Sequence, residues 1–124
     1  MSYSAVVLDS ASHVKLIHWL GAKFPPLNKD WEFIAHHMTI AMGGLPPSMV
    51  NDLGSIQELE VNGFGFNNQV IAVRVSGYFT TNVNPHVTIA VNRANGGKPV
   101  MSNVIANWHD MAPFKISGTV QELK

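Results

Sequence analysis

Apolar and polar positions alternate in two different periods along the first third of the chain. Residues 3–8 form an apolar run of strand length, and residues 9–24 follow with the spacing of an amphipathic helix. Either Asp9 or Ser10 can cap the start of this helix. The apolar side of the predicted helix carries Val14, Ile17, Leu20 and Phe24. A Pro-rich turn then ends the helix, and residues 31–42 predict a second strand.

The rest of the chain predicts further strands and one more helix. Gly and Asn cluster at 62–68 between two alternating runs, a pattern typical of a β-hairpin. The elements predicted after residue 42 are a turn with one or two helical turns at 43–54, two strands within 56–79, a strand at 86–92, a helix at 98–111 and a strand at 113–123. The order is β-α-β, two central strands, then β-α-β. It predicts an α+β chain built from two similar halves.

Two tetrapeptides in distant parts of the chain share one pattern, HMTI at 37–40 and HVTI at 86–89, and alanine follows each. Both lie in predicted strands, where successive side chains point to opposite faces. Each strand therefore has a bulky apolar face and a second face that bears an imidazole and a hydroxyl. The second face is poor core material and predicts the floor of a cleft. The four side chains expected there are His37, Thr39, His86 and Thr88.

The alanines that follow the two motifs, Ala41 and Ala90, would share the polar faces and leave room for a ligand. The competing interpretation is a duplicated structural strand whose histidines are incidental. Chance alone would place fewer than one His-x-Thr triplet in a chain with 6 histidines. Two triplets in the same strand context, each followed by Ile-Ala, favour a functional pair.

The two tetrapeptides resemble the twin His-x-Thr-x signature of the two-histidine (2H) phosphoesterase superfamily. Its members include RNA cyclic phosphodiesterases, the cyclic phosphodiesterase domains of tRNA ligases, and viral enzymes that cut 2′-5′ or cyclic oligonucleotides. The resemblance rests on these eight residues. It implies a compact two-lobed, pseudo-symmetric α+β fold over 1–124, with antiparallel sheets and outer helices around a cleft that holds both motifs.

The resemblance also implies a chemistry that needs two residues of each kind. In-line cleavage of a phosphodiester requires a base on one side of the phosphorus and an acid on the other. Histidine, with an ordinary pKa near ~6.5, can take either role. Threonine hydroxyls can donate hydrogen bonds to the phosphate oxygens. His37 and His86 are therefore the expected catalytic residues, and Thr39 and Thr88 the expected phosphate ligands. Which histidine is the acid stays open, as does a non-catalytic nucleotide- or RNA-end-binding module, or a structural protein with fortuitous motifs.

Two further side chains could contact a substrate. Alternation along 70–78 puts Arg74 and Tyr78 on one face, where Arg74 could contact phosphate and Tyr78 could stack on a base. The alternative is a solvated Arg and a partly buried Tyr. His36 neighbours His37 but is expected on the opposite face. The other histidines, His13, His18 and His109, are expected at the surface or behind the site.

Composition narrows the partners. The formal net charge is +0, with 8 basic and 8 acidic residues scattered along the chain, so a long double-stranded nucleic acid is not expected. We expect a small nucleotide or an RNA 3′ end. The chain has no Cys, and no His or carboxylate spacing predicts a metal site, so no metal or other cofactor is expected. No apolar run approaches the ~20 residues of a membrane span, and no positively charged leader precedes the first apolar run. These features predict a cytoplasmic protein with no membrane partner; its oligomeric state stays open.

Overall fold

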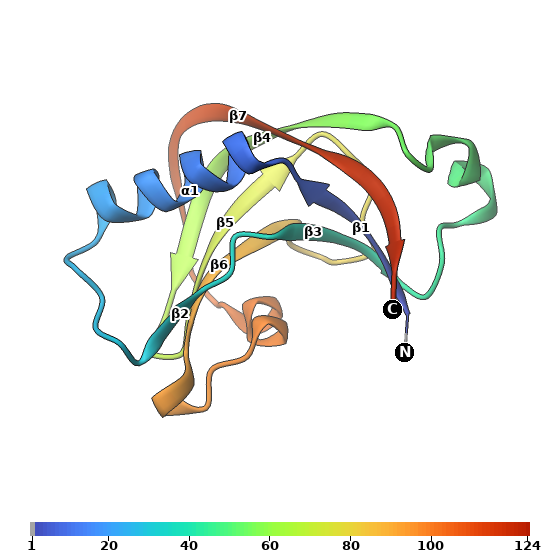
Figure 1. The fold of residues 1–124 in the computed structure, drawn as a ribbon. Helices are drawn as coiled ribbons and strands as arrows, with labels where there is room; N and C mark the ends of the chain where they lie inside the picture. The colour runs from blue at the N-terminus through green and yellow to red at the C-terminus, as the bar shows by residue number, and fades with distance from the viewer. Residues whose placement is uncertain (1) are drawn as a thin grey trace.

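The structure is a computed structural model that describes residues 2–124. Seven strands join in one sheet with the order β2-β6-β3-β1-β7-β4-β5 (Figure 1). The strands are β1 (Tyr3–Leu8), β2 (Trp31–Phe33), β3 (His37–Met42), β4 (Ile56–Phe66), β5 (Val70–Ser76), β6 (His86–Asn92) and β7 (Trp108–Leu123). The helices are α1 (Ser10–Lys23) and three 3₁₀ turns, η1 (Pro47–Asp52), η2 (Arg93–Asn95) and η3 (Pro99–Val104).

An additional pairing between β5 and β6 closes this sheet. The six strands β6, β3, β1, β7, β4 and β5 form a closed antiparallel barrel, and β2 adds to the edge of β6 as an extra strand. The prediction of two pseudo-symmetric α+β lobes with outer helices is therefore wrong. Within residues 2–124, strands from both halves of the chain share one sheet, and α1 is the α-helix of the first half without a counterpart in the second.

The segment 98–111, predicted as a second helix, forms η3 and then the start of β7. Pro99 stands at the beginning of the 3₁₀ turn. Side chains of low helix propensity are frequent in this segment and include Val100, Asn103, Val104, Ile105 and Asn107. Trp108, the first residue of β7, pairs with Gly65 of β4, so the last strand begins earlier than the predicted residue 113. Residues 108–111, which the local pattern assigned to a helix, thus belong to β7 and pair with the distant strand β4.

The helix α1 forms where the sequence predicted it. Its N-cap Asp9 accepts a hydrogen bond from the Ser12 amide at 2.7 Å. Leu16 and Leu20 are buried, whereas Val14 is 63% exposed, so the predicted apolar face was wrong for Val14. No helix in the described part of the chain is both long and apolar enough to cross a membrane.

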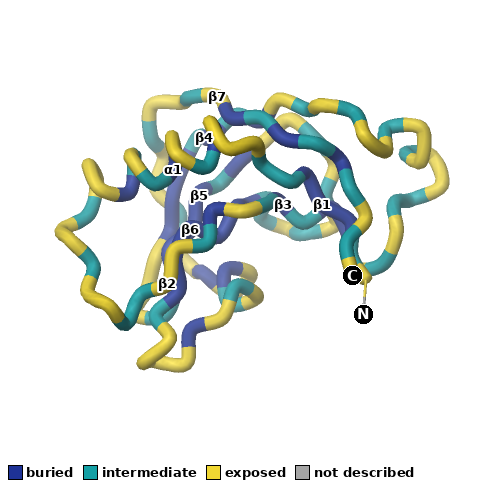
Figure 2. The backbone as a smooth tube through the Cα atoms, in the orientation of Figure 1, coloured by how far each residue is buried: buried dark blue, intermediate teal, exposed yellow. Residues whose placement is uncertain are grey.

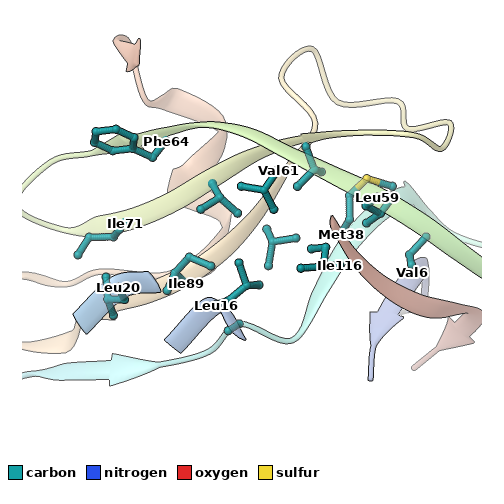
Figure 3. Packing of buried hydrophobic residues seen from close by; sticks show 14 of the residues in the cluster. Val6, Leu16, Leu20, Met38, Leu59, Val61, Phe64, Ile71, Ile89 and Ile116 are labelled. Carbon is teal, nitrogen blue, oxygen red and sulfur yellow. The ribbon is translucent and has the colours of Figure 1, made fainter. Parts of the chain in front are cut away.

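The main core lies on one face of the sheet, against α1. Leu16 and Leu20 project toward the buried side chains of the strands, as Figure 3 shows. The largest strand residues in this cluster include Val6, Met38, Ile40, Leu59, Val61, Val73, Ile89 and Ile116. In Figure 2 the buried backbone follows the strands, while the turns between them are mostly exposed. This core uses the apolar faces of β3 and β6, which leaves their other faces for the site.

A second, smaller core covers the opposite face of β5 and β6. Val70 and Ala72 point here, while their neighbours Ile71 and Val73 belong to the main core. The residues packed in this cluster are Val70, Ala72, Val91 and Ile105, with Ile34, Met101 and Trp108 at its edge. Met101 belongs to η3, so this cluster fixes η3 beside the polar faces of the two motif strands.

Candidate functional site

A pocket of about 430 Å³ lies on the face of β3 and β6 that points away from the main core. His37, Thr39, His86 and Thr88 all line it. The remaining lining comes from β1, from the segment before β3, from the last residue of β3, from the loop before β6 and from η3. These residues are Tyr3, Ile34, Met42, Thr81, Asn82, Pro99, Val100 and Asn103. The structure therefore brings together the four side chains of the repeated motif, which come from positions far apart in the sequence.

The register of β3 and β6 explains part of this convergence. Met38 pairs with Val87 in an antiparallel bridge. Met38 and Val87 belong to the main core, so their strand neighbours Thr39 and His86 point to the other face, where both line the pocket. Residues directly opposite each other in an antiparallel pair lie on the same face of the sheet. The threonine of one motif and the histidine of the other therefore face the same pocket.

Strands β2 and β3 both pair with β6, but the regular pairing is interrupted between them, just before the first motif. The Ala35 amide donates to the Thr88 carbonyl at 3.0 Å, whereas Met38 pairs with Val87. The chain advances three residues from Ala35 to Met38 while β6 advances one residue, from Thr88 to Val87. Two residues of the first segment therefore have no partner in β6. The single strand predicted over 31–42 is in fact two strands separated by a bulge.

The two extra residues are His36 and His37. Ala35, just before them, has a φ of +43°, a left-handed conformation that is rare for a residue with a Cβ. The side-chain alternation of a regular strand does not hold across this bulge. As a result the two imidazoles meet, with their Nδ1 atoms 2.9 Å apart and their planes at 82°. The expectation that His36 points to the face opposite His37 was wrong.

His37 is held in its neutral form by its surroundings. Burial lowers the pKa of His37 from 6.5 to about 4, and the positive charges that His36 and His86 can carry add to the effect. The Tyr3 ring lies 5.2 Å from the His37 ring, between centroids. At neutral pH His37 can therefore accept a proton, and in the free protein it lacks the charged form that an acid needs.

His86 has a fixed orientation. Its Nδ1 atom lies 2.7 Å from the carbonyl oxygen of Asn84. Because a carbonyl can only accept, Nδ1 carries the hydrogen, and Nε2 is the nitrogen left to exchange a proton with a ligand. The pKa of His86 is lowered, mainly because the ring is buried. The hydrogen bond to Asn84 raises this pKa and so offsets part of the effect. Of the two histidines, His86 is thus the one with a neutral acceptor placed to stabilise its charged form.

The two threonines are held differently. The Thr88 hydroxyl lies 2.7 Å from Ser102 Oγ and donates to the Pro99 carbonyl at 3.2 Å. Thr39 is anchored through its backbone, whose carbonyl accepts a hydrogen bond from Thr80 at 2.7 Å. Since a hydroxyl has only one hydrogen, Thr88 must exchange its bond to Pro99 before it can donate to a ligand.

Arg74 does not line the pocket. It lies opposite His86 in the pairing of β5 and β6, but its guanidinium turns toward another strand. There it donates to Asn62 Oδ1 at 2.8 Å and forms an ion pair with Asp110. The phosphate contact predicted for Arg74 therefore finds no support in the geometry, and the alternative of a solvated arginine is met only in part, because its side chain is 28% exposed and bonded to Asn62 and Asp110.

Tyr78 also lies outside the pocket lining. Its hydroxyl donates to Asp52 Oδ2 at 2.8 Å, and its ring packs against the main core. Burial, followed by the contact with Asp52, raises the pKa of Tyr78 to about 12. Strand β5 ends at Ser76, and Gly77 follows with a φ of +123°, so the alternation that placed Tyr78 with Arg74 stops before it.

Other lining residues were not identified from the sequence. Ala41 and Ala90, expected to leave room in the cleft, are buried in the main core. A register shift between Ser4 and Ala5 of β1 displaces the alternation near the end of β3, and Met42, 66% exposed, lines the pocket. The amides of Asn82 and Asn103 come from segments that carry no recognisable motif. Only the long-range packing of these segments brings them to the site.

The lining, drawn from residues 2–124, contains no Lys, Arg, Asp or Glu side chain. Within the same residues no group of three or more His, Asp or Glu is placed to hold a metal ion. Any charge on a ligand would therefore be met by the two imidazoles, the hydroxyls and the two amides. The rest of the pocket lining is apolar. Ile34, Met42, Pro99 and Val100 contribute to it, and the Tyr3 ring lies beside His37.

Comparison with known proteins adds little to this geometry. No protein-family model and no curated protein matches the chain. Among solved structures, the crystal structure of TT0787 of Thermus thermophilus is similar, with a TM-score of 0.48 and 14% sequence identity. The similarity covers 99% of this chain and 84% of that chain. A likeness of this degree supports no statement about the site.

Proposed function

We propose that the pocket is the active site of a metal-independent 2H-type phosphodiesterase. Its substrates are nucleotides or RNA 3′ ends with a 2′,3′-cyclic phosphate, or short oligonucleotides with a 2′-5′ or cyclic linkage. One observation carries the proposal: both His-x-Thr motifs contribute their imidazole and their hydroxyl to the same pocket. The proposal keeps the motif and its chemistry and does not depend on a two-lobed fold.

The surroundings of the two histidines divide their roles. His37, with its pKa lowered to about 4, is the base that takes a proton from the attacking water. His86, with Nδ1 bonded to the Asn84 carbonyl, is the acid that gives the Nε2 proton to the leaving ribose oxygen. In this step water forms a new P–O bond and the bond to the leaving oxygen breaks. His37 takes up one proton and His86 gives up one. For a cyclic phosphate the product is a phosphomonoester.

The acid must be charged before it can act, and the substrate itself favours this. Burial lowers the pKa of His86 in the free protein. A phosphodiester anion bound beside it favours the imidazolium and raises that pKa again. Because the described lining has no Lys or Arg, the site suits a singly charged phosphodiester better than a doubly charged phosphomonoester. That preference helps both the binding of substrate and the release of product.

The threonines complete the phosphate site. A neutral hydrogen bond such as that from Thr88 to Pro99 contributes roughly 0.5 to 1.5 kcal/mol, and a bond to a charged group roughly 1.5 to 3 kcal/mol. A phosphate oxygen therefore displaces the Pro99 carbonyl, which accepts from Thr88 at 3.2 Å. Ser102 can remain bonded to Thr88 as a donor during this exchange.

The size and lining of the pocket favour a short ligand. A volume of about 430 Å³ lies in the range of small-ligand sites. The apolar residues and the Tyr3 ring can cover a base and a ribose, and the amides of Asn82 and Asn103 can bond to polar edges of a base. A mononucleotide or the last nucleotide of an RNA strand meets these conditions.

Turnover in the presence of EDTA tests the proposal. The panel comprises the four nucleoside 2′,3′-cyclic phosphates and a set of 2′-5′-linked dinucleotides, with His18→Ala, on the exposed side of α1, as the matched control. Hydrolysis by the wild type and the control, lost in His37→Ala, is the expected result. Binding of these ligands without turnover would replace the proposal with a nucleotide- or RNA-end-binding module. If the protein neither binds nor hydrolyses these ligands, both the phosphodiesterase and the binding module are rejected.

A further inference from the structure

We propose that His36 is a positioning residue for His37 that carries protons between its ring and solvent. The inference rests on the proposed function, since it concerns the base of the same site. Its geometric basis is the contact between the two Nδ1 atoms at 2.9 Å. A hydrogen bond between two imidazole nitrogens requires a hydrogen on one and a lone pair on the other. The two rings therefore share one hydrogen along this line.

The backbone around the bulge holds the two rings in this contact. The Leu8 amide donates to the His36 carbonyl at 2.9 Å, and His13 Nδ1 donates to the Ala35 carbonyl at 2.9 Å. The bulge is thus anchored both to β1 and to α1. His36 itself is exposed, while His37 is partly buried and lines the pocket. The pair therefore connects the interior of the site with water outside it.

The two catalytic histidines differ at the same atom. Nδ1 of His86 faces a carbonyl, which can never supply a hydrogen, so the tautomer of His86 is fixed. Nδ1 of His37 faces a second imidazole, which can either take or give a hydrogen. With the shared hydrogen on His37, its Nε2 has a free lone pair and acts as the base. With the hydrogen on His36, the neutral His37 carries its own hydrogen on Nε2.

This difference gives the proton taken up by His37 a way out. When Nε2 of His37 takes a proton from water, the Nδ1 hydrogen can cross to His36, and His36 can release a proton from its own Nε2 to solvent. One proton enters the pair and one leaves it. Exchange with water at both ends then restores the starting tautomers. His37 therefore never needs to keep a positive charge, which burial and the charges that His36 and His86 can carry disfavour.

Few other groups can take part in this exchange. The titratable side chains beside His37 are His36 on the bulge, His86 on β6 and Tyr3 on β1. His13 of α1 reaches only the carbonyl behind the bulge. Within residues 2–124 the pocket lining supplies no carboxylate that could replace His36 as the carrier.

Three variants at the surface separate a proton carrier from a group that merely orients the ring. His36→Ala removes the partner, His36→Asn keeps a hydrogen-bonding group that cannot take a proton at neutral pH, and His18→Ala is the matched control. We expect both His36 variants to lose about tenfold in kcat with little change in KM. Added imidazole should restore much of the loss in His36→Ala, and His18→Ala should behave as wild type.

A measurement that needs no activity keeps this test separate from that of the proposed function. Nitrogen-15 NMR of the His37 ring reports its tautomer and its pKa. We expect the Nδ1 signal to lie between the protonated and unprotonated limits in the wild type and to move to one limit in His36→Ala. An unchanged His37 signal would overturn the inference, whether or not the protein is an enzyme. Full activity of His36→Asn, with wild-type turnover present, would reduce His36 to an orienting group and overturn the proton-carrying role.

Discussion

The Thr88 hydroxyl lies 2.7 Å from the Ser102 hydroxyl, and this contact links the second motif strand to η3. Ser102 is buried, at 1% exposure. Its neighbours in η3, Pro99, Val100 and Asn103, form one wall of the pocket. The residue expected to bind phosphate is therefore also the residue that holds this wall in place, so phosphate binding and the position of η3 are coupled.

Substitution of Ser102 tests this coupling. Ser102→Ala removes one hydrogen bond in a buried environment and should lower the free energy of unfolding by about 1 kcal/mol. It should raise KM several-fold and leave kcat within a factor of two or so, because the wall loosens while the histidines remain. A double-mutant cycle with Thr88→Val should give a coupling energy of about 1 kcal/mol in denaturant unfolding. Strictly additive effects would mean that the two hydroxyls act independently.

The pH dependence of turnover follows from the two histidines. The pKa of His37 is lowered to about 4 and that of His86 lies below its ordinary 6.5, both mainly because of burial. The free enzyme needs one neutral and one charged imidazole. We therefore expect a bell-shaped profile of kcat/KM with its maximum between pH 4 and 6.5. The optimum of kcat should lie higher, because bound phosphate raises the pKa of His86. A kcat/KM maximum above pH 7 would contradict this account.

Stability should also depend on the protonation of His37. Folding lowers its pKa from 6.5 to about 4, so the folded state binds fewer protons than the unfolded state between these values. The part of the free energy of unfolding that depends on neutral His37 is fully present above pH 6.5. It is lost as the pH falls toward 4, and the loss is about 3 kcal/mol. His37→Gln lacks this titration. Urea unfolding at pH 7 and pH 4 should show a smaller loss for the variant by about that amount, and equal losses would rule out the lowered pKa.

Arg74 offers a test of the boundary of the site. Its side chain is 28% exposed and that of its partner Asp110 is 91% exposed. Ion pairs exposed to this degree contribute roughly 0 to 1 kcal/mol. Arg74→Gln should therefore reduce stability by less than about 1 kcal/mol and leave KM for a cyclic nucleotide unchanged. A large rise in KM would return Arg74 to the phosphate site.

The candidate site could be predicted from the sequence because it depends on local periodicity. His37 with Thr39, and His86 with Thr88, are two residues apart within strands, and that spacing alone puts each pair on one face. The strand Tyr3–Leu8 and the helix capped by Asp9 were predicted for similar local reasons and are confirmed.

The closed barrel could not be predicted in this way. It depends on the closing contact between β5 and β6 and on the pairing of β7 with both β1 and β4, and those two partners of β7 lie far from it in sequence. The same holds for the bulge before the first motif. Nothing local in the sequence around Ala35 signals a φ of +43°, so the contact between His36 and His37 emerges only from the structure.

The most direct test of the central claim is single-turnover hydrolysis of a nucleoside 2′,3′-cyclic phosphate with EDTA present. The variants are His37→Ala, His86→Ala, the double variant and the control His18→Ala, each checked by thermal melting. We predict losses of ~10² to 10⁴-fold for each single histidine variant. The double variant should be little slower than the slower single variant, because acid and base act as one unit. Full activity in either folded single variant would contradict the claim that this pair of histidines catalyses the reaction.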